Sequence, residues 1–160
     1  FLAARRAASL IWQISAFTLA HTITLALAAT GLVNLPSSLV EPVIAFTIAF
    51  VAVENLLFKD VVKWRPVVVF IFGLIHGLGF ASFFSALDLP PGLFWSALIG
   101  FNIGVEIGQM GIVVLAAVAV RLCFKKPAQD VRYQKWILRP GSALIGLSGL
   151  WWGFSAALNL

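Results

Sequence analysis

The sequence predicts an all-α fold, a polytopic bundle of transmembrane helices with five spans in a single domain over residues 1–160. Of the 160 residues, 61% are hydrophobic and 11% are charged, with a mean hydropathy of +1.02, whereas soluble chains carry about 25% charged residues. Long stretches carry no charge at all, and a helix needs roughly 20 apolar residues to cross a bilayer. This composition excludes a soluble domain and a disordered chain, and the single Cys123 excludes a disulfide scaffold.

The apolar runs and the breakers between them place the spans at residues 7–30, 41–58, 66–87, 93–122 and 137–160. Gly31 and the loop around Pro36 end the first span, and Asp88 with the prolines after it ends the third. The fourth span is longer than a bilayer requires, so we expect it to be tilted or to extend into water.

The eleven Lys and Arg residues predict the orientation of these spans. All of them fall on one side of the membrane when five spans are counted, and the opposite loops hold only Glu41 and Asp88 as charged residues. The positive-inside rule then places the basic loops in the cytoplasm and the C-terminus outside. We interpret the net charge of +5 as topology and contact with the lipid bilayer, and we expect no nucleic-acid partner.

Polar side chains with metal-ligating atoms remain inside the spans when the loop charges are set aside. They are His21, Glu54, Asn55, His76, Asn102, Glu106 and Gln109. At about 1.5 Å per residue, both histidines, Glu106 and Gln109 lie about 15–22 Å from the cytoplasmic edge, and Glu54 lies at about 6 Å. Asn102, Glu106 and Gln109 follow one another at i, i+4 and i+7, which places them on one face of a helix. A charged side chain at the centre of a transmembrane helix costs roughly 2.5–3.5 kcal/mol, so we expect this layer to have a function.

Four segments of the chain resemble the HupE/UreJ family of hydrogenase and urease accessory membrane proteins, in its second subfamily. The segments are 17–25 (FTLAHTITL), 53–55 (VEN), 72–81 (FGLIHGLGFA) and 101–109 (FNIGVEIGQ). Thr22 stands where the family has Ser, and this change keeps the hydroxyl group. The resemblance implies a permease connected with nickel supply in the bacterial inner membrane. It also implies a further N-terminal helix before Phe1 with the pattern H-x-x-x-G-x-D-H, which would make six spans and add metal ligands.

The first functional hypothesis is transport of a divalent transition metal ion, with nickel first and cobalt, copper or zinc as alternatives. His21 and His76 would bind the ion through neutral imidazole, and Glu106 would neutralise it, sharing the ion with His76. The remaining ligands or orienting groups would be the amide side chains of Gln109, Asn102 and Asn55. Glu54 would connect the site to the cytoplasm.

Two other hypotheses remain open. An intramembrane metal-dependent hydrolase would use Glu106 or Glu54 as general base for a metal-bound water, although the sequence holds no nucleophile motif. A structural or accessory subunit would pack against a larger membrane complex, or against copies of itself, with the polar residues only bracing the bundle. Glycines four residues apart favour close helix packing in three spans, at Gly73 and Gly77, at Gly100, Gly104 and Gly108, and at Gly149 and Gly153.

Overall fold

The computed structural model describes residues 7–58, 64–90, 92–124, 127 and 130–158, and the regular structure of this part of the chain is helical throughout. The helices are α1 (Ala7–Ala29), α2 (Ser37–Leu57), α3 (Arg65–Gly79), α4 (Ala81–Ser85), α5 (Phe94–Cys123), α6 (Val131–Tyr133) and α7 (Arg139–Leu158), with a π-helical segment at Gln134–Leu138. The predicted all-α fold is therefore confirmed. The helical stretches long and apolar enough to cross a membrane are Leu10–Ala29, Ser37–Leu57, Phe94–Cys123 and Val131–Leu158, whereas α3 is shorter.

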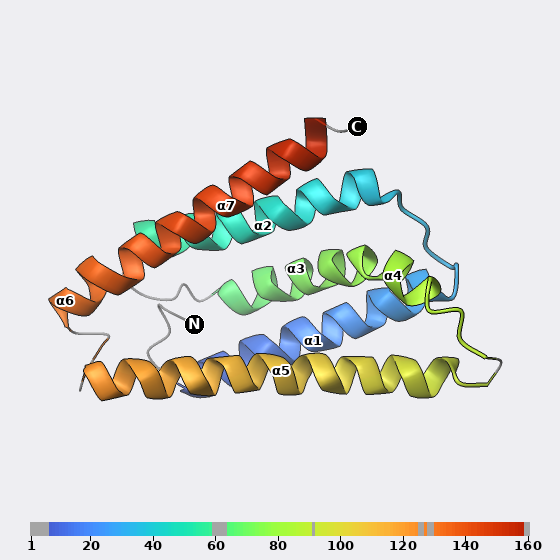
Figure 1. Ribbon diagram of the computed structural model, residues 1–160, viewed down its shortest axis with the longest axis horizontal. Coiled ribbons are helices and arrows are strands. Elements are labelled where there is room, and N and C mark those ends of the chain that lie inside the picture. The colour runs from blue at the N-terminus through green and yellow to red at the C-terminus, as the bar shows by residue number, and fades with distance from the viewer. Residues whose placement is uncertain (1–6, 59–63, 91, 125–126, 128–129, 159–160) are drawn as a thin grey trace.

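The long helices lie side by side in an elongated bundle (Figure 1). α7 runs along α2, α2 contacts α3, α3 runs along α1, and α1 contacts α5. The lateral order is therefore α7, α2, α3, α1 and α5, so that α2, α3 and α1 are covered on both sides. Near one end of the bundle, Leu25, Phe84 and Leu98 form a buried apolar cluster that joins α1, α4 and α5.

Glycines bring α3 into direct contact with the backbone of α1. A Cβ atom added at Gly73 would lie 2.5 Å from the carbonyl oxygen of Phe17. One added at Gly77 would meet the backbone oxygen of His21 and the side chain of Thr24. Only a residue without a side chain fits at either position, and the close packing predicted from this glycine pair is confirmed.

α7 lies on α2 in the same way. A Cβ atom added at Gly149 would lie 3.0 Å from both the carbonyl oxygen of Ala45 and the amide nitrogen of Ala49. One added at Gly153 would lie 2.7 Å from the ring of Phe46. The glycine pair on α7 thus holds the second close interface of the bundle, again as predicted.

α5 departs from this pattern, although its glycines have the same spacing. On α5 an added Cβ would meet no atom within 4 Å at Gly100, Gly104, Gly108 or Gly111. The side of α5 that contacts α1 instead carries Leu98 and Asn102, its buried residues. The predicted close packing at the α5 glycines is therefore wrong for the part of the chain described here, because they lie on the face turned away from the bundle.

Local backbone chemistry explains where α1 ends and where α2 begins. Gly31 adopts a left-handed conformation (φ +77°) after α1, and the N–H groups of Gly31 and Leu32 each donate at 3.0 Å to carbonyls of the last turn. This is the Schellman arrangement, which satisfies carbonyls that the helix end leaves free. α2 begins at Ser37 rather than at residue 41, because Pro36 has the extended conformation of an N-cap and the serines after it form the first turn.

The third span is interrupted at Phe80, where the sequence analysis expected one helix over residues 66–87. α3 ends at Gly79 and the short α4 follows Phe80. Three glycines lie within residues 73–79, and each lowers helix stability by about 1 kcal/mol relative to Ala. The interruption brings the Phe80 ring against His21, at 5.5 Å between ring centroids.

The last helical stretch begins at Val131, before the expected start at residue 137. The π-helical segment ends two residues before Pro140, which has no N–H to donate and whose ring crowds the preceding turn. The wider π turn accommodates this proline without ending the helix. Asp130 caps the start, since its carboxylate accepts a hydrogen bond from the Arg132 N–H at 2.8 Å, which lowers the pKa of Asp130 from its usual value.

Candidate functional site

Polar side chains join α1 to α5 over the part of their interface that lies beyond the apolar cluster of Leu25 and Leu98. The hydrogen bonds are Ser15 Oγ to Glu106 Oε1 at 3.5 Å, Thr18 Oγ1 to Gln109 Oε1 at 3.4 Å, and Thr22 Oγ1 to Asn102 Oδ1 at 2.7 Å. His21 Nδ1 also lies 3.3 Å from Asn102 Oδ1. The three residues predicted to share a face of the fourth span thus all contact α1, and the hydroxyl groups of α1 are their partners.

The hydrogen bonds of Asn102 determine which nitrogen of His21 carries a proton. The Asn102 side-chain nitrogen donates to the Leu98 carbonyl at 2.8 Å, so the amide oxygen is the atom that faces α1. Because an amide oxygen only accepts, Nδ1 of His21 must be the donor. Nε2 of His21 is then left with a free lone pair in the neutral ring.

Aromatic rings surround His21, whose side chain is 2% exposed. Phe17 and Phe101 stack against the imidazole at 6.2 and 6.3 Å between ring centroids, and Phe80 meets it edge to face at 5.5 Å. α1, α5 and the residue between α3 and α4 each supply one of these rings. The enclosure keeps water from the imidazole and holds its orientation.

His76 has the same kind of arrangement on α3. Its Nδ1 lies 2.8 Å from the Phe72 carbonyl oxygen, which can only accept, so Nδ1 carries the proton and Nε2 is free. The Phe17 ring meets His76 edge to face at 5.1 Å. Phe17 therefore contacts both imidazoles.

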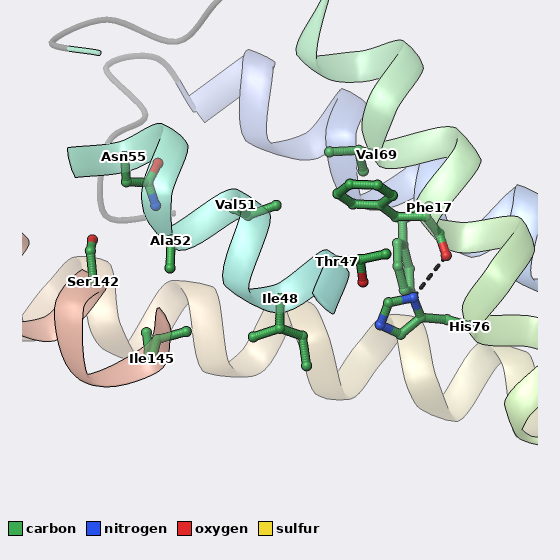
Figure 2. A pocket seen from close by; sticks show the side chains of 11 residues that line it. Phe17, Thr47, Ile48, Val51, Ala52, Asn55, Val69, His76, Ser142 and Ile145 are labelled. Carbon is green, nitrogen blue, oxygen red and sulfur yellow. Dashed lines mark hydrogen bonds between the residues drawn. The ribbon is translucent and has the colours of Figure 1, made fainter. Parts of the chain in front are cut away.

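His76 lines a cavity of about 510 Å³ between α1, α2, α3 and α7. The lining residues are Phe17, Thr47, Ile48, Val51, Ala52, Asn55, Val69, Phe72, His76, Ser142 and Ile145. Figure 2 shows His76 and Thr47 at one end of the cavity, Asn55 and Ser142 at the other, and apolar side chains between them. The imidazole nitrogen that makes no hydrogen bond points into this space in the same view.

Ser142 also lines this cavity, although it is not among the site residues predicted from the sequence. Its side chain is 1% exposed, and its hydroxyl has no hydrogen-bond partner among the described residues. The available signal is its position on one face of α7 with Gly146, Gly149 and Gly153, the buried small residues of this helix. A buried hydroxyl without a partner among the described residues favours a polar ligand or water at this end of the cavity.

Glu54, Asn55 and Arg65 form a third cluster, between the end of α2 and the start of α3. Arg65 Nε lies 3.5 Å from Glu54 Oε2, and an Arg65 side-chain nitrogen donates to Asn55 Oδ1 at 2.9 Å. By sequence alone Arg65 belongs to the charges of a basic loop, but the residue is only 4% exposed. The missed signal is depth: Glu54 was placed about 6 Å inside the membrane edge, where the first turn of the next helix can reach it.

The predicted metal ligands therefore fall into three groups. His21, Asn102, Glu106 and Gln109 lie between α1 and α5; His76 and Asn55 line the cavity; and Glu54 pairs with Arg65. Among the described residues, no three His, Cys, Asp or Glu side chains come together in a group that could hold a metal ion. No hydrogen bond or ion pair of the described residues joins His76 to Glu106, the pair expected to share an ion.

These features define the class of protein, a multi-pass α-helical membrane protein with polar side chains buried between its helices. The family profile described as HupE / UreJ protein matches residues 1–156 of the chain. The chain therefore belongs to the HupE/UreJ family. No curated protein and no solved structure gives a significant match.

Proposed function

We propose that this protein carries a divalent transition metal ion, nickel first, across the bacterial inner membrane, with its basic loops in the cytoplasm and its C-terminus outside. His21 and His76 bind the ion through their Nε2 atoms. The lateral order of the helices supports this proposal, because α3, which carries His76, is the middle helix and α1, which carries His21, lies directly beside it. Cobalt, copper and zinc remain alternative cargoes, since imidazole binds all of them.

The single observation that carries the proposal is the hydrogen bonding of the two imidazoles. Each Nδ1 faces an oxygen that can only accept, that of Asn102 for His21 and that of Phe72 for His76. Histidines that bind metals donate their other ring N–H to a carbonyl or carboxylate in this way, which fixes the tautomer and the ring orientation. Both lone pairs are therefore prepared for a cation.

The remaining residues of the predicted set have supporting roles. Asn102 orients His21, and Glu106 with Gln109 supplies a negative charge and an amide oxygen on the same helix face, to balance the charge of the ion. Asn55 and Glu54 lie toward the basic end of the bundle and connect the cavity with the cytoplasm. A site with few charged ligands suits a cargo that must leave again, because transport requires binding that is favourable and still reversible.

Uptake of ⁶³Ni²⁺ into cells that lack this protein tests the proposal. The wild-type gene should restore uptake, and His21→Ala and His76→Ala should each remove most of it at equal protein levels in the membrane. Glu41→Gln, which changes an exposed carboxylate at the start of α2, is the control and should behave as wild type. Uptake that depends on the protein but on neither histidine would show the proposed ligands to be wrong.

A second candidate function is that of an accessory subunit in a larger membrane complex. The open glycine face of α5 favours this function, because an added Cβ at Gly100, Gly104, Gly108 or Gly111 would meet nothing within 4 Å. Glycine stripes of this kind allow another helix to approach closely. Purified protein that binds no metal and keeps its full thermal stability in chelator would favour this function over transport.

A further inference from the structure

The Glu54 carboxylate is buried and incompletely bonded. Its side chain is 5% exposed, and neither of its oxygens accepts a hydrogen bond from any described residue. Among the described residues the cationic partner of Glu54 is Arg65, whose Nε lies 3.5 Å from Oε2 and also makes no hydrogen bond. A charge-assisted N–H···O⁻ bond has a length of about 2.7–2.9 Å, so the two groups attract each other without forming one.

The same guanidinium group is held by Asn55. An Arg65 side-chain nitrogen donates to Asn55 Oδ1 at 2.9 Å. A carboxylate and an amide oxygen from two consecutive residues of α2 therefore converge on one positive charge. Carboxylate and amide oxygens are also ligands of divalent cations, and they bind transition metals less strongly than imidazole does.

We infer that Glu54 and Asn55 form a second cation site, which the guanidinium of Arg65 fills in this structure, and that a divalent cation takes the place of Arg65 there on its way between His76 and the cytoplasm. The inference extends the proposed transport function, and its path is the cavity. Asn55 lines the same space as His76, at the opposite end (Figure 2). Ser142 lies beside Asn55 at that end, with a hydroxyl that is free to meet a hydrated ion.

Arg65 suits this role because its charge is permanent. A guanidinium cannot be deprotonated in a protein, so it can release Glu54 only by moving away. Arg65 is the first residue of α3, and its side chain can therefore swing without disturbing the interior of the helix. While it stays in place, it repels any cation at this end of the cavity and keeps the Glu54 charge balanced.

The test counts Co²⁺ ions bound per chain by the purified protein in lipid nanodiscs, by equilibrium dialysis and elemental analysis. Arg65→Gln removes the charge but keeps a hydrogen-bond donor for Asn55, and it should bind one Co²⁺ more than wild type. Arg65→Gln combined with Glu54→Gln should return to the wild-type number, as should Arg65→Lys, which keeps the charge. Arg65→Gln combined with Glu41→Gln is the matched carboxylate control and should keep the extra ion.

Arg65→Gln leaves a buried charge unbalanced, so a second variant keeps the test decisive if this one does not fold. Asn55→Asp has nearly the same shape and adds a carboxylate, so a divalent cation competes better with the singly charged Arg65 guanidinium and takes its place. It should also bind one Co²⁺ more than wild type, and adding Glu54→Gln should remove that ion. An unchanged Co²⁺ number in the folded variant, or an extra ion that survives Glu54→Gln, would overturn the inference.

Adding His76→Ala to the variant with the extra ion separates this inference from the proposed function. If both hold, His76→Ala removes the ion at the imidazoles and leaves the ion at Glu54. An extra ion at Glu54 in a protein whose Co²⁺ binding ignores His76 would contradict the imidazole site alone. Loss of the extra ion together with the imidazole ion would contradict the independent second site.

Discussion

Substitution of Gly77 by Ala is the sharpest test of how α3 and α1 fit together. The new Cβ would meet the backbone oxygen of His21 and the side chain of Thr24, and it would lie 3.0 Å from the amide nitrogen of Leu25. Two of these three contacts are with backbone atoms, which cannot rotate away, so the helices must separate. Overpacking of this kind costs up to about 3 kcal/mol, and Ala regains about 1 kcal/mol of helix propensity over Gly.

The net loss of about 2 kcal/mol corresponds to a fall in Tm of roughly 4–8 °C for a chain of this size. Thermal unfolding in detergent, followed by circular dichroism at 222 nm, measures it. Gly104→Ala is the matched control, because its Cβ would meet nothing within 4 Å. It should leave the Tm unchanged or raise it slightly. Equal behaviour of the two variants would refute backbone contact between α3 and α1 at Gly77.

Three further predictions concern the polar groups. Asn102→Leu removes the acceptor for His21 Nδ1 and should weaken Ni²⁺ binding about 10–100-fold by titration calorimetry; unchanged affinity would contradict the orienting role. Arg65→Ala leaves the buried Glu54 carboxylate unpaired and should cost about 3–5 kcal/mol of unfolding free energy. The double variant Glu54→Gln with Arg65→Gln should cost much less, because no charge is left unpaired. Equal losses in the two variants would show that the unpaired Glu54 charge does not cause the loss of stability. Ser142→Ala removes a buried hydroxyl without a partner among the described residues and should raise metal-free stability by about 1 kcal/mol, measured against exposed Ser148→Ala; a clear loss would mean that the hydroxyl is bonded.

The sequence alone predicts the class of fold, because composition and glycine spacing can be evaluated within each helix. The apolar runs give the helices, and Gly73 with Gly77 marks an interface that the structure contains. The same spacing on α5 gave the wrong result, since a glycine pattern shows that a helix can be approached closely and not that the partner is part of the same chain. The face of α5 that turns inward carries Leu98 of the apolar cluster and the polar side chains that bond to α1.

The sequence predicts which residue types lie in the candidate site better than it predicts which of these residues lie close together. Helix periodicity placed Asn102, Glu106 and Gln109 on one face, and these three residues do contact the same helix. Depth along the membrane could not show that His76 faces a cavity beside α2 while Glu106 faces α1, because depth contains no information on rotation about a helix axis. The burial of Arg65 was missed for a related reason, as a charge at a span end can turn inward when a carboxylate lies within reach.

X-ray absorption at the nickel edge of the purified, Ni²⁺-loaded protein tests the central claim most directly, because outer-shell scattering counts imidazole ligands. The hydrogen bonds of His21 and His76 leave both Nε2 atoms free, so the wild-type spectrum should show two imidazoles per nickel. His21→Ala and His76→Ala should each reduce this to one, or lose the ion. A nickel ion bound without imidazole, or a spectrum that neither substitution changes, would contradict the account.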